Sequence, residues 1–350
     1  MYLKRFHVEV VVSGFCLLLA VAPTFVSAHE VYVLRTGDIQ KAMMGPAMPV
    51  MQVILDNLHQ FIFWAFLCFV VITTIFFMSI SRYAERMLNP FFRRVKSYAP
   101  LLVRMSVGAS MLASAYNQAL FGPELPFTAL FGAYTPIATA AIVSSGSLLI
   151  ARSWTRVAML VVILTFAAGV YATGSYMLTY AEYLDAFAMM FLLEAASQKS
   201  TSGILGTFIS RSGQAIKPYR FAILRILFGI ALVYASVYAK LLHPTLTLMV
   251  IEQYHLTSYW LFGAFEPHFL VLGAAFIELL CGIFFIVGFE IRHTSLFVLF
   301  WLTLSLLFFG ESVWPHIIIF GLAGAFFLYG YDRYSLEGRY FKRGDREPVL

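Results

Sequence analysis

The chain has 350 residues, of which 61% are hydrophobic and only 12% are charged. This composition excludes an ordinary soluble globular protein and predicts an all-α polytopic membrane protein whose main partner is the lipid bilayer. The net charge of +6 does not predict nucleic-acid binding, because membrane proteins keep Lys and Arg in cytoplasmic loops. Three cysteines without a Cys-x-x-Cys pair exclude thiol–disulfide chemistry within the chain itself.

The N-terminus has the pattern of a secretory signal peptide over residues 1–28. Lys4 and Arg5 precede an apolar stretch, and Val26-Ser27-Ala28 forms a small-residue cleavage site. Cleavage would leave His29 as the first residue, outside the cytoplasm. An uncleaved first span is the alternative, and it also places His29 on the outer side.

Residues 29–52 form a short extracytoplasmic segment rich in methionine. Met43, Met44 and Met48, together with His29, offer the thioether and imidazole ligands that suit copper. The alternative, which we favour, is an apolar lead-in to the first span in which Met fills irregular gaps.

Nine apolar segments follow as predicted transmembrane helices, each bounded by charge, Gly or Pro. Nearly all Lys and Arg outside these segments fall on one side, which predicts an outer N-terminus and a cytoplasmic tail at 332–350. The predicted spans are 53–80, 100–120, 130–151, 157–173, 178–196, 221–242, 267–289, 294–309 and 313–331.

Histidine and glutamate gather on the predicted outer side. The largest outer loop, residues 243–266, contains a run at 246–251 that could lie along the interface as a short helix. The outer face is therefore a candidate site for polar chemistry, although wet loops carry such residues without any function. The candidates are His243, Glu266, His268, Glu311 and His316.

Two predicted spans carry charges at membrane depth. Lys240 and Arg225 lie near opposite ends of 221–242, and Glu278 lies near the middle of 267–289. Side chains on a helix lean toward its N-terminus, so in antiparallel helices Lys240 and Glu278 lean toward each other, and a direct or one-water contact is expected. Arg225 is expected to lean toward the cytoplasmic headgroups.

The sequence contains a weak internal repeat. An offset of 121 residues pairs Arg104 with Arg225 and Gly108 with Gly229, and an offset of 136 pairs Gly146 with Gly282. This predicts two four-helix units, 100–196 and 218–331, related by a pseudo-twofold axis along the membrane normal. The first unit lacks counterparts of both Lys240 and Glu278, which marks the second unit as the one with a site.

The second unit resembles the DoxX-like family of four-helix membrane proteins. The residues that carry the resemblance are Arg225-x3-Gly229, Lys240-Leu241-x2-Pro244 and Glu278-Leu279-x2-Gly282. Relatives of that family include the DoxD-type small subunit of thiosulfate:quinone oxidoreductase and the methylamine-utilisation protein MauE. The resemblance implies a bacterial or archaeal cell (inner) membrane and a redox-associated or accessory role. The first unit, 100–196, is similar only as a degenerate copy.

Four functions are compatible with these features, and they leave open whether the chain is an enzyme. The first is an accessory or quinone-side subunit of a membrane oxidoreductase, with Lys240 and Glu278 as a proton or quinone-oxygen site. Haem, iron–sulfur and dinucleotide motifs are missing from the sequence, so electrons would come from an oxidoreductase partner or a quinone. The others are a transporter of a small molecule or ion, a metal-handling protein, and a structural scaffold.

Overall fold

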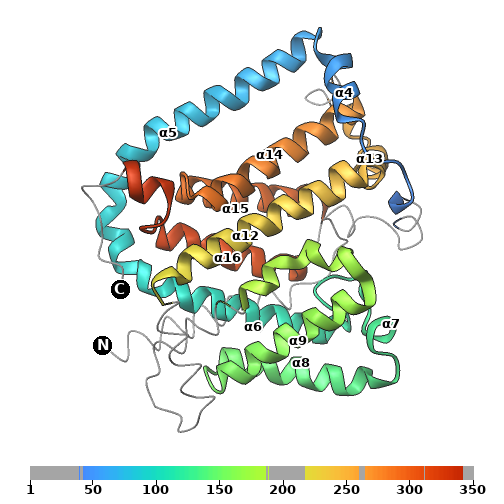
Figure 1. The fold of residues 1–350 in the computed structure, drawn as a ribbon, viewed down its shortest axis with the longest axis vertical. Coiled ribbons are helices and arrows are strands. Elements are labelled where there is room, and N and C mark those ends of the chain that lie inside the picture. Colours follow the sequence, from blue (N-terminus) through green and yellow to red (C-terminus); the bar gives the residue numbers. More distant parts are fainter. Residues whose placement is uncertain are drawn as a thin grey trace.

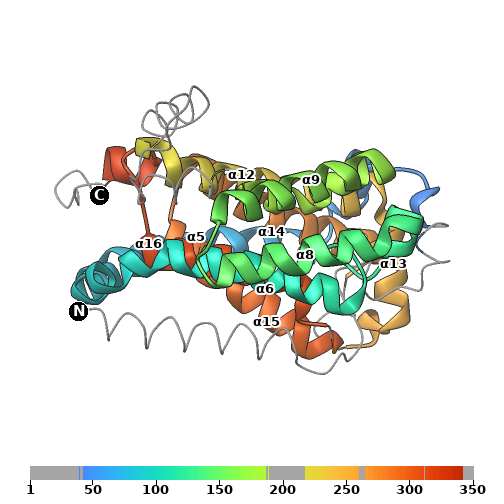
Figure 2. The same cartoon turned by 90° about the horizontal axis from the view of Figure 1, so that it is seen from below.

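The computed structural model of the chain is all-helical (Figure 1). It describes residues 39, 42–186, 188, 217–259, 265–310 and 312–341. The predicted signal peptide, His29 and Glu311 lie outside the described residues. Turned by 90°, the long helices run roughly along one direction (Figure 2), as expected of a bundle that crosses a bilayer.

The first half of the chain builds one group of helices. Apolar stretches separated by Pro, Gly and polar turns set the boundaries, for example Pro126 before α7 and Gly174 after α9. In chain order the elements are α4 Val50–Asn57, α5 Phe61–Val95, η1 Lys96–Tyr98, α6 Ala99–Asn117, α7 Phe127–Phe131, η2 Gly132–Tyr134, α8 Thr135–Ile150, α9 Thr155–Thr173 and the 3₁₀ segment η3 Gly174–Leu184.

The second half repeats this alternation of long apolar helices and short turns. A π-helical stretch, η5, continues α12, and the predicted short helix of the outer loop is present as α13. The elements are η4 Lys217–Tyr219, α12 Arg220–Ser236, η5 Val237–Leu242, α13 Pro244–Gln253, η6 Leu256–Ser258, α14 Pro267–Val287, α15 Ile291–Phe309, η7 Trp314–His316, α16 Ile317–Tyr329 and η8 Glu337–Phe341.

Six helical segments of the described part are long and apolar enough to cross a membrane, rather than the nine predicted. Helix α6 has the length but carries Arg104 and several serines, and Trp314–Tyr329 is shorter. The segment Thr155–Leu184 contains a turn at Gly174 that brings Met177 back against Gly169, and its continuation as the predicted span 178–196 is only partly described. The chain is a multi-pass membrane protein.

Helix α5 is longer than the predicted span 53–80. It continues to Val95 and would be about 52 Å long at 1.5 Å per residue, against roughly 30 Å of hydrocarbon. Aromatic contacts join it to the bundle near both ends, where Phe66 lies 5.8 Å from Phe269 and Phe92 lies 5.3 Å from Phe327, ring centre to ring centre. Many apolar side chains in its middle are exposed. Figure 1 shows the helix running along one edge of the molecule.

Glycines allow two helix pairs to approach closely. A Cβ added to Gly229 on α12 would lie 2.6 Å from the carbonyl oxygen of Gly282 on α14. A Cβ added to Gly146 on α8 would lie 2.8 Å from the carbonyl oxygen of Gly108 on α6. Small residues are what membrane helices use where backbones touch.

The two halves are joined by exchanged packing, in which a helical segment late in each half packs on a helix earlier in the other half. Helix α16 packs most extensively on α6, where Gly321 lies against Ser106, and η3 packs on α12. The hydroxyl of Tyr234 on α12 donates a hydrogen bond of 3.0 Å to the carbonyl of Ser175 on η3. The interface between the halves is therefore lined by η3, α12, α16 and α6.

Candidate functional site

The predicted ion pair between the α12–η5 segment and α14 is present. Lys240 Nζ donates a hydrogen bond of 2.9 Å to Glu278 Oε2. The π-helical stretch η5 carries Lys240 and ends at Leu242; His243 follows, and Pro244 opens α13. π-Helical turns widen the backbone locally and often occur at functional sites.

The two charges are unequally buried. The Lys240 side chain is 5% exposed, whereas the Glu278 side chain is 29% exposed. Charges in a membrane interior require partners, and each member of this pair supplies the opposite charge that the other needs. The carboxylate is the half of the pair that a molecule approaching from outside the bundle would meet.

Arg225 corrects the sequence-based expectation. The residue is only 2% exposed, so its guanidinium does not extend to the headgroups. Its Nε donates a hydrogen bond of 3.1 Å to Asp332 Oδ2. Its Nη1 donates to the carbonyl oxygens of Phe285 and Ile286, and the bond to Ile286 is 2.8 Å long. The last carbonyls of a helix lack partners within it, and α14 ends here at Gly288, which adopts φ +72°. Arg225 thus closes the end of α14.

Part of the predicted tail is folded against this arginine. Ser335 is buried under Gly288, and the Glu337 N–H donates a hydrogen bond of 3.0 Å to the Gly288 carbonyl. The Glu337 carboxylate accepts a bond of 3.3 Å from the N–H of Ile291 at the start of α15. Residues 332–338 therefore pack against the helices, and Arg225 has a structural role.

Two of the outer-face candidates form a helix cap. Glu266 is the N-cap of α14 and accepts hydrogen bonds from the N–H groups of His268 and Phe269, both at 3.0 Å. Its carboxylate also lies 2.7 Å from Nδ1 of His268. Burial raises the pKa of Glu266, but these bonds from His268 and Phe269 outweigh burial, so its pKa lies below the usual value.

The other two described candidates, His243 and His316, take no part in this cap. His316 is not in a wet loop but buried, with Nδ1 3.2 Å from the carbonyl oxygen of Ser312. The ring of His243 packs 4.6 Å from that of Tyr238, and its buried Nδ1 has no hydrogen-bond partner within the described part of the chain.

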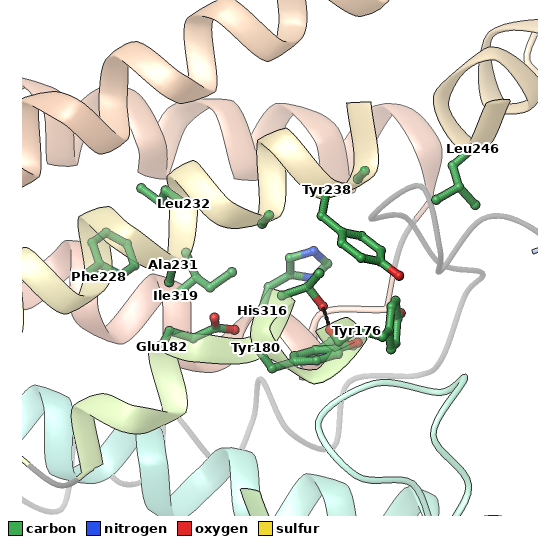
Figure 3. A pocket seen from close by; sticks show the side chains of 14 residues that line it. Tyr176, Tyr180, Glu182, Phe228, Ala231, Leu232, Tyr238, Leu246, His316 and Ile319 are labelled. Carbon is green, nitrogen blue, oxygen red and sulfur yellow. Dashed lines mark hydrogen bonds between the residues drawn. The ribbon is translucent and has the colours of Figure 1, made fainter. Parts of the chain in front are cut away.

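A cavity of about 40 Å³ lies at the interface between the two halves. It has room for a few water molecules. His316 and Glu182 project into it, with tyrosines gathered at one end and Phe228 at the other (Figure 3). Its lining comes from η3, α12, η5, α13, η7 and α16: Tyr176, Thr179, Tyr180, Glu182, Phe228, Ala231, Leu232, Ala235, Tyr238, Ala239, Leu246, Pro315, His316 and Ile319.

Sequence reasoning missed two acidic residues of the first half, Glu182 and Asp185. Glu182 is 5% exposed and Asp185 is fully buried. Glu124 accepts a hydrogen bond of 3.0 Å from the Tyr176 hydroxyl and a shorter one from Tyr180. Three acidic residues in the predicted span 178–196, Glu182, Asp185 and Glu194, were the available signal, because acidic residues in membrane spans are costly and usually functional.

The methionine segment packs as an apolar lead-in does. Met43 packs against the main core, Met48 is buried in a separate cluster with Val53 and Phe269, and Met44 is exposed. Among the described residues there is no group of three or more His, Cys, Asp or Glu placed to hold a metal ion. Copper binding through Met43, Met44, Met48 and His29 stays a prediction.

Comparison with known proteins places the ion pair in a family segment. Residues 221–312 match the DoxX family model. This segment runs from α12 through α15 and contains Arg225, Lys240 and Glu278. Neither a curated protein nor a solved structure matches the chain.

Proposed function

We propose that this multi-pass protein, with its DoxX segment, is an accessory or quinone-side subunit of a membrane oxidoreductase. The observation that carries the proposal is the Lys240–Glu278 pair at 2.9 Å inside the matched segment. Structural ion pairs are common, but this one leaves its carboxylate partly accessible while burying its ammonium. That asymmetry suits a site that an apolar molecule enters from the bilayer.

The chemistry follows from the two groups. A quinone oxygen that displaces Glu278 from one N–H of Lys240 would be hydrogen-bonded by the ammonium, which stabilises charge developing on that oxygen. Glu278 can then give or take the proton that accompanies reduction or oxidation. Electrons come from the partner subunit.

The test is activity in the native complex. The chain is isolated in mild detergent with whatever oxidoreductase subunit accompanies it, and quinone-dependent turnover is compared for wild type and Lys240→Met/Glu278→Leu. We expect a double variant that inserts and folds but loses turnover. Full activity in a folded double variant would favour the scaffold alternative. Substrate flux in vesicles without any copurifying redox partner would favour the transporter alternative.

We also propose that residues 100–196 and 218–331 arose by duplication. Arg104 donates hydrogen bonds of 2.8 and 3.4 Å to the carbonyls of Leu149 and Ile150. The offset of 121 residues pairs Arg104 with Arg225, and the offset of 136 pairs the two carbonyl residues with Phe285 and Ile286. Arg225 donates to those two carbonyls, so the same contact occurs in both units. The same offsets relate the two close glycine pairs, and the exchanged packing of η3 on α12 and α16 on α6 fits a twofold relation. An experimental structure in which the units have different helix order would refute this.

The signal peptide and the location complete the proposal. The protein lies in a bacterial or archaeal cell membrane, with an outer N-terminus beginning at His29. Mass spectrometry of the mature chain tests the cleavage: an N-terminal peptide that begins before residue 29 contradicts it.

A further inference from the structure

The cavity between the halves is separated from the ion pair by the η5 backbone. Tyr238 and Ala239 line it, whereas the next residue, Lys240, bonds to Glu278 on α14. The cavity is therefore a second polar region, distinct from the site proposed above. Its acidic group, Glu182, comes from η3, outside the DoxX segment.

Asp185 follows η3 and is not among the residues that line the cavity. It lies three residues after Glu182, and residues three apart on a helical turn share a face. Asp185 is fully buried, and neither of its carboxylate oxygens has a hydrogen-bond partner in the part of the chain that the structure describes. An ionised carboxylate in such surroundings is costly, so the group requires a bound proton or another cation.

The other titratable groups around the cavity are few. His316 on η7 and Tyr238 on η5 face Glu182 across it, and Tyr176 and Tyr180 lie on η3 itself. Neither Lys nor Arg is among the described residues that line the cavity. The remaining described titratable groups of the elements around it, none of which lines the cavity, are Arg156, Tyr171, Tyr183, Arg220, Arg225, Tyr234, Lys240, Glu252 and Tyr329.

We propose that Glu182 and Asp185 form a proton-binding site, which water reaches through the tyrosine-lined end of the cavity. A single O–H bond forms when the pair takes up a proton, and the same bond breaks on release, with His316 placed to exchange that proton with water in the cavity. The tyrosine-lined end adjoins the turn at Gly174, which is on the predicted outer side. The site gives the protein an acid–base group inside the membrane that does not depend on the Lys240–Glu278 pair.

The first test uses dicyclohexylcarbodiimide, an apolar reagent that couples to protonated carboxyl groups. Purified full-length protein is labelled in lipid nanodiscs, and adducts are mapped by mass spectrometry. We expect an adduct on Asp185 or Glu182 of the wild type, its loss in Asp185→Asn/Glu182→Gln, and its retention in Lys240→Met/Glu278→Leu. This last control separates the site from the proposed function.

Two outcomes would overturn the proposal. A folded wild type with no adduct at residues 182 and 185 would show that neither carboxyl is protonated and reachable. Protection by sodium chloride at fixed pH would assign the site to a metal cation. Because the wild-type adduct map decides both, the result does not depend on whether the variants fold.

The second test concerns water access. Thr179 lines the cavity, so Thr179→Cys is introduced into a chain whose own cysteines are replaced, and a membrane-impermeant thiol reagent is added to sealed vesicles. We expect labelling from the side that holds Gly174. The matched control is Ile142→Cys, at a fully buried position on α8, which should stay unlabelled. Equal protection of both cysteines would refute an open path.

Discussion

At the scale of single residues, burial separates groups that look alike in the sequence. Lys240 and Arg225 are both basic residues in one apolar segment, yet one binds a partly exposed carboxylate and the other a buried aspartate and two helix-end carbonyls. Of the two partners, Glu278 keeps 29% of its side chain exposed and Asp332 only 6%. The chemistry of the pair and its contribution to stability can therefore be tested separately.

Removing one member of the Lys240–Glu278 pair should destabilise the protein more than removing both. A lone buried charge costs up to about 3–5 kcal/mol, while an apolar double replacement is close to neutral. Because Lys240 is the more buried partner, Glu278→Leu, which strands it, should cost more than Lys240→Met. Unfolding in detergent measures this, and a double variant whose loss equals the sum of the single losses would contradict it.

The Glu266 cap should make stability depend on acid pH. The folded-state pKa lies below the unfolded value of about 4.3, so the contribution is present above that value and is lost as pH falls through the folded-state pKa. The melting temperatures of wild type and Glu266→Gln should therefore differ near neutral pH and converge in acid. A difference that persists unchanged at low pH would exclude the carboxylate as its cause.

At the scale of helices, the turns and ends are as informative as the spans. Helix α14 begins at a glutamate cap and ends at a left-handed glycine held by an arginine from α12. The same pair of helices touches backbone to backbone at Gly229 and Gly282. Helix α14, which carries Glu278, is thus fixed at both ends and at its crossing.

Gly229→Ala should force α12 and α14 apart. The added methyl group would lie 2.6 Å from the backbone oxygen of Gly282, and overpacking of this kind costs about 1–3 kcal/mol. Gly273→Ala on α14 is the matched control, because its Cβ meets only Phe66 at 3.4 Å or more. Thermal unfolding should show a loss for the first substitution alone; similar melting temperatures for the two would contradict the close packing.

At the scale of the whole molecule, the two halves are held together by helices that cross between them. The exchanged packing places the cavity at the interface, away from the ion pair. The distribution of basic residues predicts how this bundle is oriented in the membrane, with the N-terminus outside and the C-terminal tail in the cytoplasm.

Single cysteines test that orientation. Ser258 and Tyr340 are both accessible, unlike Ser335, which is buried and would not react. In a chain without other cysteines, Ser258→Cys should react with an impermeant reagent from outside intact cells, and Tyr340→Cys only after permeabilisation. Reaction of both from the same side would refute the predicted topology.

The sequence by itself determined most helix boundaries and the Lys240–Glu278 contact. Both follow from local rules: apolar runs end at Pro, Gly or charge, and the lean of side chains along antiparallel helices fixes which charges meet. The resemblance to the DoxX-like family rested on residues in the same short segment, which the family model matches.

Only the tertiary structure decided the partner of Arg225, the burial of His316 and the polar cavity. Arg225 and Asp332 are 107 residues apart, and Glu182 and His316 come from different halves of the chain. No periodicity in the sequence encodes which distant helix packs on which, because helix pairing depends on the shapes of whole faces. The ion pair lies between consecutive long helices, so its position was predictable. The cavity lies between helices from different halves of the chain, so its position was not.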